Sequence, residues 1–276
     1  DHGVEVLFFW DRNKRLLATA VNVACPAQEV EGRSAVNADF WHEAREMLRK
    51  RYGKDLLVLG WTGAAGDQSP HLMYRKQAEE RMRQLRGLTR LEELARRIVQ
   101  AVDEAYQGAV KEIRTDVPLV HLVEHIKLPV RKVTPQELAN AKAQVAALSK
   151  DPRNQRRVLW HQEVVERFER QKANPHYSME LHVVRLGDVA ICTNDFELFT
   201  DYGIMIKARS KALQTFVLQL SGRSGAGYLP TERAVRAGGY SAIVESSLVG
   251  PEGGQVLVDR TVELINSLWP SPGTKP

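Results

Sequence analysis

Short loops after apparent β-strands carry residue types that could do chemistry. The first spans residues 66–71 and reads Gly-Asp-Gln-Ser-Pro-His, so that it combines a carboxylate, a hydroxyl and an imidazole. Asp67 and Ser69 could supply an orienting acid and a nucleophile. Adjacent side chains seldom point at one another, so we do not expect a triad built from this loop alone. The loop is also compatible with a tight turn in which Asp67 accepts backbone N–H groups.

Two further loops are candidates of the same kind. Residues 194–197 read Asn-Asp-Phe-Glu, and Glu197 could bind a metal or act as a general base. The alternative is a helix start, where acidic residues are favoured in the first turn. Residues 225–231 place Tyr228 after glycines, which let a backbone approach a ligand closely while the phenol projects. An ordinary turn with Tyr228 packed over it is the alternative.

The sequence lacks the familiar nucleotide and metal motifs. It contains no Gly-x-Gly-x-x-Gly, no Walker loop, no Cys-x-x-Cys and no His-Glu-x-x-His. Nucleotide-dependent chemistry is therefore disfavoured, and the eight histidines show no complete metal site.

Alternating strand and helix patterns must position these loops, and they predict an α/β fold. Apolar β-rich runs at 3–10 and 16–24 predict a hairpin. A continuous apolar run at 56–61 predicts a strand buried on both faces. Residues about 72–175 read as a charged helical insertion with helix starts at Thr89 and Thr134. Further strands are expected at 117–130, 179–186, 189–193 and 215–220, and helices at 38–51, 196–207 and 256–269.

Composition narrows the class of protein. The 276 residues are 43% hydrophobic and 26% charged, as in an ordinary globular domain. No apolar stretch is long enough to span a membrane. The net charge of +5 is spread among interspersed acids and bases, and no motif supports nucleic-acid binding. Two cysteines are too few for a disulfide framework.

Taken together and in this order, the loops resemble the neutral/alkaline non-lysosomal ceramidase family. The resemblance extends over nearly the whole chain, although residues 72–180 contribute little to it. It rests on five stretches of the sequence: residues 66–70 (Gly-Asp-Gln-Ser-Pro); residues 195–199, followed by Gly203 and residues 206–210; residues 227–232, followed by residues 239–240; residues 22–25; and residues 37–40.

The resemblance implies a zinc amide hydrolase with a sandwich of mixed β-sheets flanked by helices. In that family two histidines, a glutamate and a tyrosine hold the metal, and the last two correspond to Glu197 and Tyr228. Ser69 corresponds to the family's essential hydroxyl, within the loop that also contains Asp67. The resemblance thus implies zinc as cofactor, with metal-activated water attacking a carbonyl.

Two departures affect the implied ligand set. The family's Cys-His-Pro-Thr reads Cys25-Pro26-Ala27-Gln28, so proline occupies a ligand position. Cys25 is one residue away, but on a strand that shift points a side chain to the opposite face. The other histidine belongs to a motif expected before residue 1. We therefore expect residues 1–276 to form a single domain that is the C-terminal portion of a longer one.

These observations leave two functions open. One is a metal-dependent hydrolase acting on an amide or ester, with a substrate other than ceramide because the candidate loops are small and polar. The other is an inactive relative that binds a ligand or glycan in the remnant cleft. Expected partners are a small-molecule, lipid-like or glycan-like substrate, and a second copy or a missing N-terminal segment. The resemblance alone favours a secreted or periplasmic location.

Overall fold

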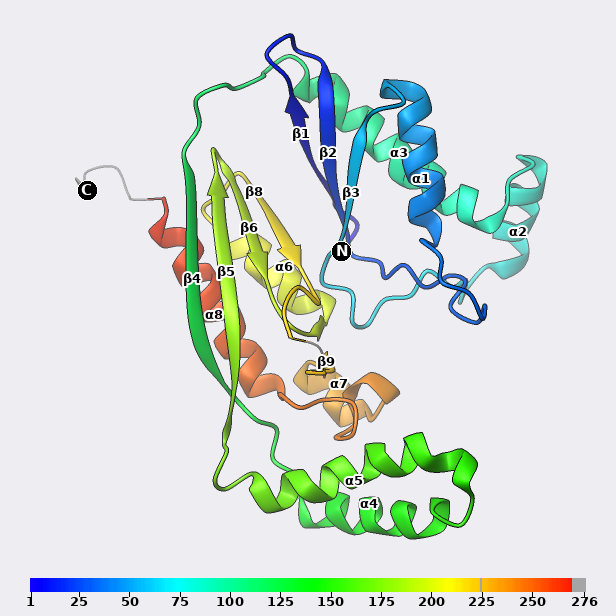
Figure 1. Ribbon diagram of the computed structural model, residues 1–276, viewed down its shortest axis with the longest axis vertical. Helices are drawn as coiled ribbons and strands as arrows, with labels where there is room; N and C mark the ends of the chain where they lie inside the picture. Colours follow the sequence, from blue (N-terminus) through cyan, green and yellow to red (C-terminus); the bar gives the residue numbers. More distant parts are fainter. Residues whose placement is uncertain (224, 270–276) are drawn as a thin grey trace.

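The computed structural model describes residues 1–223 and 225–269 as two α/β layers and a helical hairpin (Figure 1). The mixed sheets flanked by helices confirm the predicted fold class. Residues 224 and 270–276, which the predicted single domain includes, lie outside the described residues. In the described ranges no helix is both long and apolar enough to cross a membrane.

The first layer is a three-stranded sheet covered by two helices. Strands β1 (Val4–Trp10) and β2 (Leu16–Val23) form the predicted antiparallel hairpin, and β3 (Leu57–Thr62) pairs in parallel with β2. Asp11 shapes the hairpin turn, because its carboxylate accepts the backbone N–H groups of Asn13 and Arg15. Helices α1 (Phe40–Tyr52) and α3 (Arg90–Ala109) bury their apolar stripes against this sheet.

One expectation for this sheet is wrong. The apolar run at 56–61 predicted a strand buried on both faces, but Leu57 is 63% exposed and Leu59 is 46% exposed. The reason is that β3 lies at an edge of the sheet, and the helices cover only one face. Val58, which points the other way, is buried in the core.

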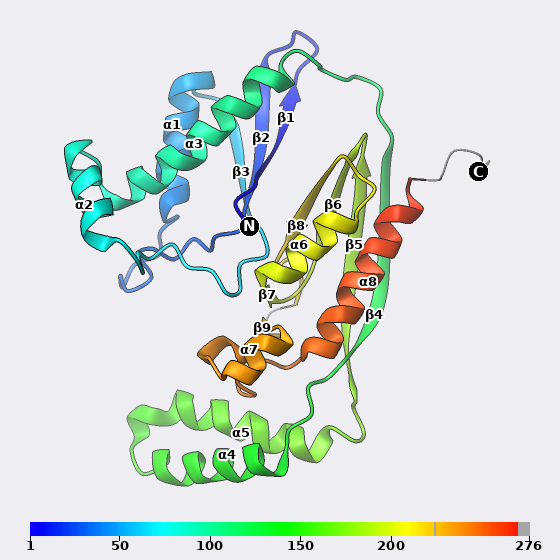
Figure 2. The same ribbon diagram turned by 180° about the vertical axis from the view of Figure 1, so that it is seen from behind.

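The second layer is a four-stranded sheet in the order β4-β5-β6-β8. Strands β4 (Leu119–Pro129) and β5 (His176–Leu186) pair antiparallel, β6 (Val189–Thr193) continues antiparallel, and β8 (Gln214–Leu218) is parallel to β6. Helices α6 (Thr200–Arg209) and α8 (Pro251–Ser267) lie on one face of the sheet (Figure 2). Strand β4 lies at an edge of this sheet, a position that tolerates Pro129 at its end because proline has no backbone N–H to donate.

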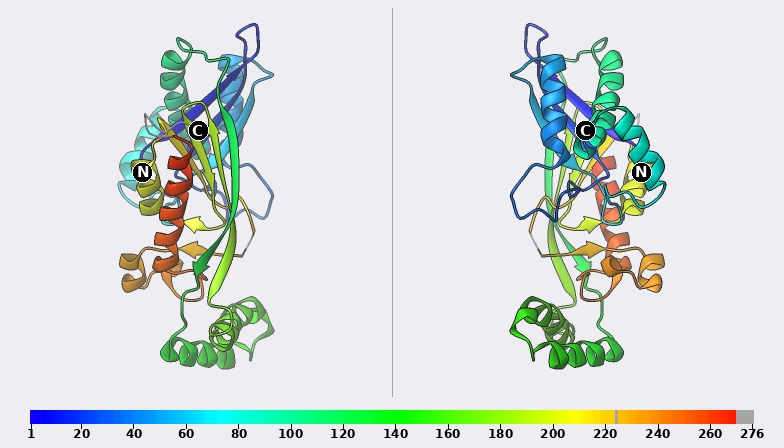
Figure 3. Two further views of the ribbon diagram at one scale, coloured as in Figure 1. Left: turned by 90° about the vertical axis from the view of Figure 1, so that its left-hand side faces the viewer. Right: turned by 90° about the vertical axis from the view of Figure 1, so that its right-hand side faces the viewer.

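The remaining helices belong to the predicted insertion and the end of the chain. Helix α2 (Lys76–Leu85) precedes α3, while α4 (Pro135–Leu148) and α5 (Gln155–Arg170) form a hairpin at one end of the molecule (Figure 3). Both predicted helix starts are present, and each of them, at Thr89 and at Thr134, has a capping box. A 3-10 turn (Pro152–Asn154) separates α4 from α5, at the predicted interruption. Short elements complete the fold: β7 (Glu197–Leu198), β9 (Tyr228–Leu229), α7 (Glu232–Ala237) and a 3-10 turn (Tyr240–Ala242).

Buried polar side chains join the two sheets. Asn22 on β2 is fully buried, and its amide donates to the Val217 carbonyl of β8 at 3.2 Å. The backbone N–H of Gln219 donates to the Thr62 carbonyl at 3.1 Å. These bonds bring the carboxyl ends of β3 and β8 together, and such ends are where α/β folds place their ligands.

Candidate active site

Gln219 organises the loops at the point where the strands end. Its side chain is buried, and one amide oxygen accepts the backbone N–H groups of Ala65 at 3.0 Å and Leu198 at 3.1 Å. The loop after β3 and the short strand β7 are therefore fixed to the same atom. Both predicted loops, at 66–71 and 194–197, consequently meet at one place in the fold.

Two buried polar residues turn the chain from β6 into β7. The Asn194 side chain accepts the Phe196 N–H at 3.0 Å and donates to the Leu218 carbonyl at 3.1 Å. Asp195 accepts a hydrogen bond from the Tyr177 hydroxyl at 2.7 Å and from the Arg223 N–H at 3.2 Å. A helix was predicted from residue 196, but β7 comes first and α6 begins only at Thr200. Glu197 therefore lies on a strand and not in a helical first turn.

Strands β7 and β9 bring two of the predicted site residues together. They pair in parallel, with Glu197 in register with Tyr228 (Figure 2). The Tyr228 N–H donates to the Ser246 carbonyl at 2.9 Å. Gly227 permits this approach, because its φ is +69° and an added Cβ would lie 2.3 Å from the same carbonyl oxygen. The register and the glycine thus fix the phenol beside the carboxylate.

Glu197 and Tyr228 form one interacting pair. The phenol lies close enough to the carboxylate to act on its pKa by hydrogen bonding, and both side chains are partly buried. Burial raises the pKa of Glu197 above its ordinary value, and the Tyr228 hydrogen bond offsets part of that rise. Burial also raises the pKa of Tyr228, and the hydrogen bond to Glu197 and its charge add to the effect. A partly desolvated carboxylate beside a phenol is suited to accepting a proton or binding a cation.

The loop at 66–71 lies against the backbone of this pair. The Gly66 N–H donates to the Leu198 carbonyl at 2.8 Å, and a Cβ added to Gly66 would lie 2.2 Å from the Glu197 carbonyl oxygen. The Asp67 carboxylate accepts the N–H of Thr200 at 2.8 Å and its hydroxyl at 2.6 Å, so it ties the loop to the start of α6. Ser69 is exposed, and its hydroxyl oxygen accepts the His71 N–H at 3.2 Å.

Two further residues contact the candidate loops. Arg90, the first residue of α3, donates to the Glu29 carboxylate at 3.2 Å and to the Pro70 carbonyl at 2.6 Å. It thereby joins the loop after β2 to the loop after β3. Tyr240 places its ring edge-on to Tyr228, with ring centroids 6.0 Å apart, and is 69% exposed.

The described residues supply only part of a metal site. A catalytic zinc ion is usually held by three protein ligands. The pair offers a carboxylate and a phenol, and residues 1–223 and 225–269 contain no group of three His, Cys, Asp or Glu side chains placed to hold a metal. Burial raises the pKa of Cys25 to about 11, helped by Asp39 and Glu29, which disfavours a thiolate beside Pro26. Among the described residues the pair therefore offers two oxygen donors, fewer than the three protein ligands of a usual catalytic zinc site.

Sequence reasoning identified the pair but missed residues that position it. Gln219 looked like a polar residue at the end of a strand, and Arg90 like one of many charges on a solvated helix. Their roles depend on contacts between residues far apart in the chain, namely 154 residues for Gln219 with Ala65 and 61 for Arg90 with Glu29. The capping box beginning at Thr89 did locate the helix start on which Arg90 lies.

Comparison with known proteins relates this fold to solved ceramidases. The fold is similar to neutral ceramidase from Pseudomonas aeruginosa, with a TM-score of 0.62 and 16% identity over 98% of this chain and 48% of that one. A structure described as ceramidase complexed with C2 gives a TM-score of 0.60 and 14% identity, over 98% of this chain and 49% of that one. No protein-family model and no curated protein matches the sequence.

These comparisons show a ceramidase-like fold, as the resemblance of the loops predicted. The chain spans about half the length of the solved structures it matches. At this level of identity the similarity concerns the fold alone.

Proposed function

We propose that this protein is a hydrolase that cleaves an amide or ester bond, and that Glu197 and Tyr228 lie at its reacting centre. The observation that carries the proposal is the buried pairing of this carboxylate with a phenol. Of the described residues, only Tyr228 lowers the pKa of Glu197, and no lysine or arginine neutralises the carboxylate. Structural carboxylates that are partly buried normally have such a partner, so its absence here favours a functional role.

Zinc is the cofactor we propose for this site. Glu197 and Tyr228 would hold the ion. Its other ligands would come from outside the described residues. When bound, zinc supplies a water of lowered pKa and polarises the carbonyl to be cleaved. The oxygen donors of the pair suit this ion, which accepts carboxylate oxygens as ligands.

The chain's own residues have distinct proposed roles. Glu197 holds a proton or a cation at its carboxylate. The Tyr228 phenol orients that carboxylate while no ion is bound and would be the second ligand when one is. Ser69 offers an exposed hydroxyl to the substrate. It lies in the loop whose Gly66 packs directly against the backbone of β7. Asp67 acts as a positioning residue, because its hydrogen bonds to Thr200 hold this loop in place.

We propose that the substrate is a polar amide or ester and not ceramide. The residues after Gly66 are polar and exposed, namely Asp67, Gln68 and Ser69. A site that accepts long acyl chains needs an apolar lining. Cleavage of short-chain ceramide without turnover of any polar amide or ester would contradict this part of the proposal.

A second candidate is a protein that binds a ligand at this site without catalysis. It is favoured by Pro26 at a ligand position of the resembling family, and by the missing third ligand among the described residues. Metal dependence separates the two candidates, since the binding protein should hold a ligand equally well after chelation.

The test is a panel of amides and esters assayed with added zinc and after chelation. We expect zinc-dependent turnover that falls about a hundredfold or more in Glu197→Gln, the scale of losing a group that handles a proton. Glu104→Gln, at an exposed position on α3, is the matched control and should keep full turnover. Full turnover in Glu197→Gln would refute the assignment, and ligand binding without turnover would favour the second candidate.

A further inference from the structure

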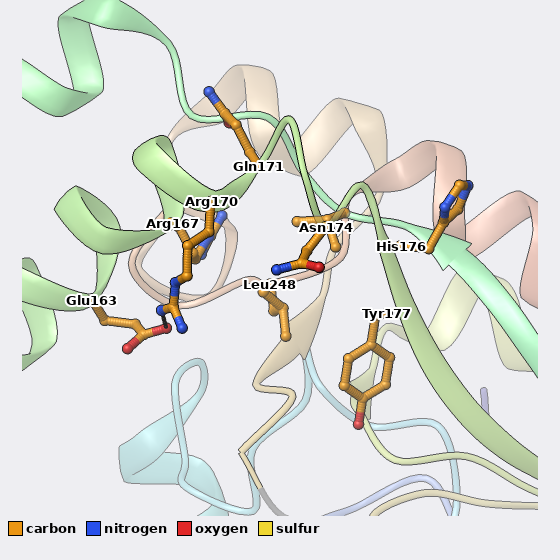
Figure 4. Close-up of a pocket in the computed structure, with 9 residues that line it drawn as sticks. Glu163, Arg167, Arg170, Gln171, Asn174, His176, Tyr177 and Leu248 are labelled. Atoms are coloured by element: carbon orange, nitrogen blue, oxygen red, sulfur yellow. Dashed lines mark hydrogen bonds and ion pairs between the residues drawn. The ribbon is translucent and has the colours of Figure 1, made fainter.

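A cavity of about 230 Å³ lies between the end of α5 and the start of β5 (Figure 4). Its walls carry Arg167 and Arg170 of α5, followed by Asn174 and Tyr177. The cavity is separate from the hydrolase proposal, because neither Glu197 nor Tyr228 contributes to its lining. Although much of its lining is apolar, its wall contains one buried guanidinium, that of Arg167.

Arg167 is a buried cation without an ion-pair partner among the described residues. It is 7% exposed, and its guanidinium donates to the Val244 carbonyl at 2.8 Å and to the Arg131 carbonyl at 3.3 Å. Its Nε–H is buried and has no partner in the described part of the chain. Burial and the nearby charge of Arg131 lower the pKa of Arg167 to about 10, although the charges of Glu163, Glu137 and Glu245 offset part of the decrease. A buried charge in this state is costly unless an anion accompanies it.

The other charged residues of the cavity do not supply that anion. Glu163 lies in the wall, but its carboxylate pairs with Arg170 at 3.4 Å. Arg170 also contacts Glu166 at 3.3 Å, so this group of exposed charges is internally balanced. The hydroxyl of Tyr177 already donates to Asp195. Glu163, Glu137 and Glu245 act on Arg167 only from a distance, and none of the described carboxylates forms a direct ion pair with it.

We propose that this cavity binds a small anion through its carboxylate or phosphate oxygens, with Arg167 as the buried counter-charge. The free Nε–H of Arg167 donates to the ligand, and Arg170 and Asn174 complete the contact from the exposed side. Guanidinium groups bind both classes of anion by charge-assisted hydrogen bonds. The volume of about 230 Å³ is sufficient for a small anion.

The experiment measures thermal unfolding of the whole chain in sodium acetate and in sodium phosphate, each titrated at constant ionic strength against sodium chloride. A ligand that binds only the folded state raises the Tm with its concentration. We expect saturable stabilisation by at least one of the two anions, beyond that in chloride. The anion that stabilises identifies the ligand as a carboxylate or a phosphate, and either result supports the site.

Variants connect the effect to the cavity. Arg167→Met should abolish the anion-dependent rise in Tm, and Arg170→Gln, at an exposed position, should raise the apparent Kd about tenfold. Arg156→Gln, exposed on the same helix, is the matched control and should respond like the wild type. If Arg167→Met does not fold, the wild type and Arg170→Gln still carry the test.

A purely structural role makes the opposite prediction. Arg167 would then only connect α5 to Val244 and Arg131, and acetate and phosphate would shift the Tm of the wild type and of Arg167→Met by the same non-saturating amount, through their general effect on protein stability. That result, or an unchanged response in both Arg167→Met and Arg170→Gln, would overturn the proposal.

Discussion

The contact between Gly66 and β7 makes the sharpest test of how the site is assembled. A Cβ added to Gly66 would lie 2.2 Å from the Glu197 carbonyl oxygen and 2.7 Å from its carbon. These are backbone atoms of a paired strand, so they cannot move aside as a flexible side chain would. Overpacking of this kind costs about 1–3 kcal/mol. Loss of the 2.8 Å bond from the Gly66 N–H to the Leu198 carbonyl adds about 1 kcal/mol.

We therefore expect Gly66→Ala to lower the free energy of unfolding by about 2–4 kcal/mol, measured by urea denaturation. Gly32→Ala is the matched control, because no atom lies within 4 Å of the added Cβ. It should change stability by no more than about 0.5 kcal/mol. If Gly66→Ala unfolds at the same urea concentration as the control, the loop does not press on β7 and the described assembly of the site is wrong.

Two further predictions concern a helix cap and a titrating carboxyl. Thr134→Ala should lower the free energy of unfolding by about 1 kcal/mol, because the Thr134 hydroxyl accepts the Glu137 N–H at 3.2 Å. An unchanged midpoint in urea denaturation would contradict this prediction. Because the pKa of Glu197 is raised, the folded state holds the carboxyl proton more tightly than the unfolded state does. The stabilising effect of this proton is therefore complete below the ordinary glutamate pKa and is lost as pH rises through the folded-state pKa. Relative to wild type, Glu197→Gln should thus gain stability between acidic and neutral pH in urea titrations, and a flat difference would contradict the shift.

Local patterns predicted much of the fold. Strand β6 coincides with the predicted range 189–193, and β5 ends where predicted, at residue 186, but begins three residues earlier than expected, at His176. The capping boxes at Thr89 and Thr134 mark helix starts, because they are formed by residues three apart and need no tertiary contact. Such features are local, so a single sequence contains the information that defines them.

Features that depend on the packing of distant segments were not predictable. The exposure of Leu57 follows from the edge position of β3, which no pattern within residues 56–61 expresses. The strand β7 consists of two residues and forms because β9 pairs with it, whereas the local sequence looked like a helix start. Tyr228 and Glu197 were each named as candidates, but only the pairing of these strands shows that they touch.

The central claim is that Glu197 and Tyr228 act as one unit at the functional centre. Its most direct test is an NMR titration of the glutamate side-chain carboxyl carbons in the wild type and in Tyr228→Phe. We predict that Glu197 titrates above the ordinary range of a glutamate in the wild type, and higher still in Tyr228→Phe, because the variant removes the hydrogen bond that lowers its pKa. An ordinary pKa for Glu197 in the wild type, or a pKa that Tyr228→Phe leaves unchanged, would contradict the claim.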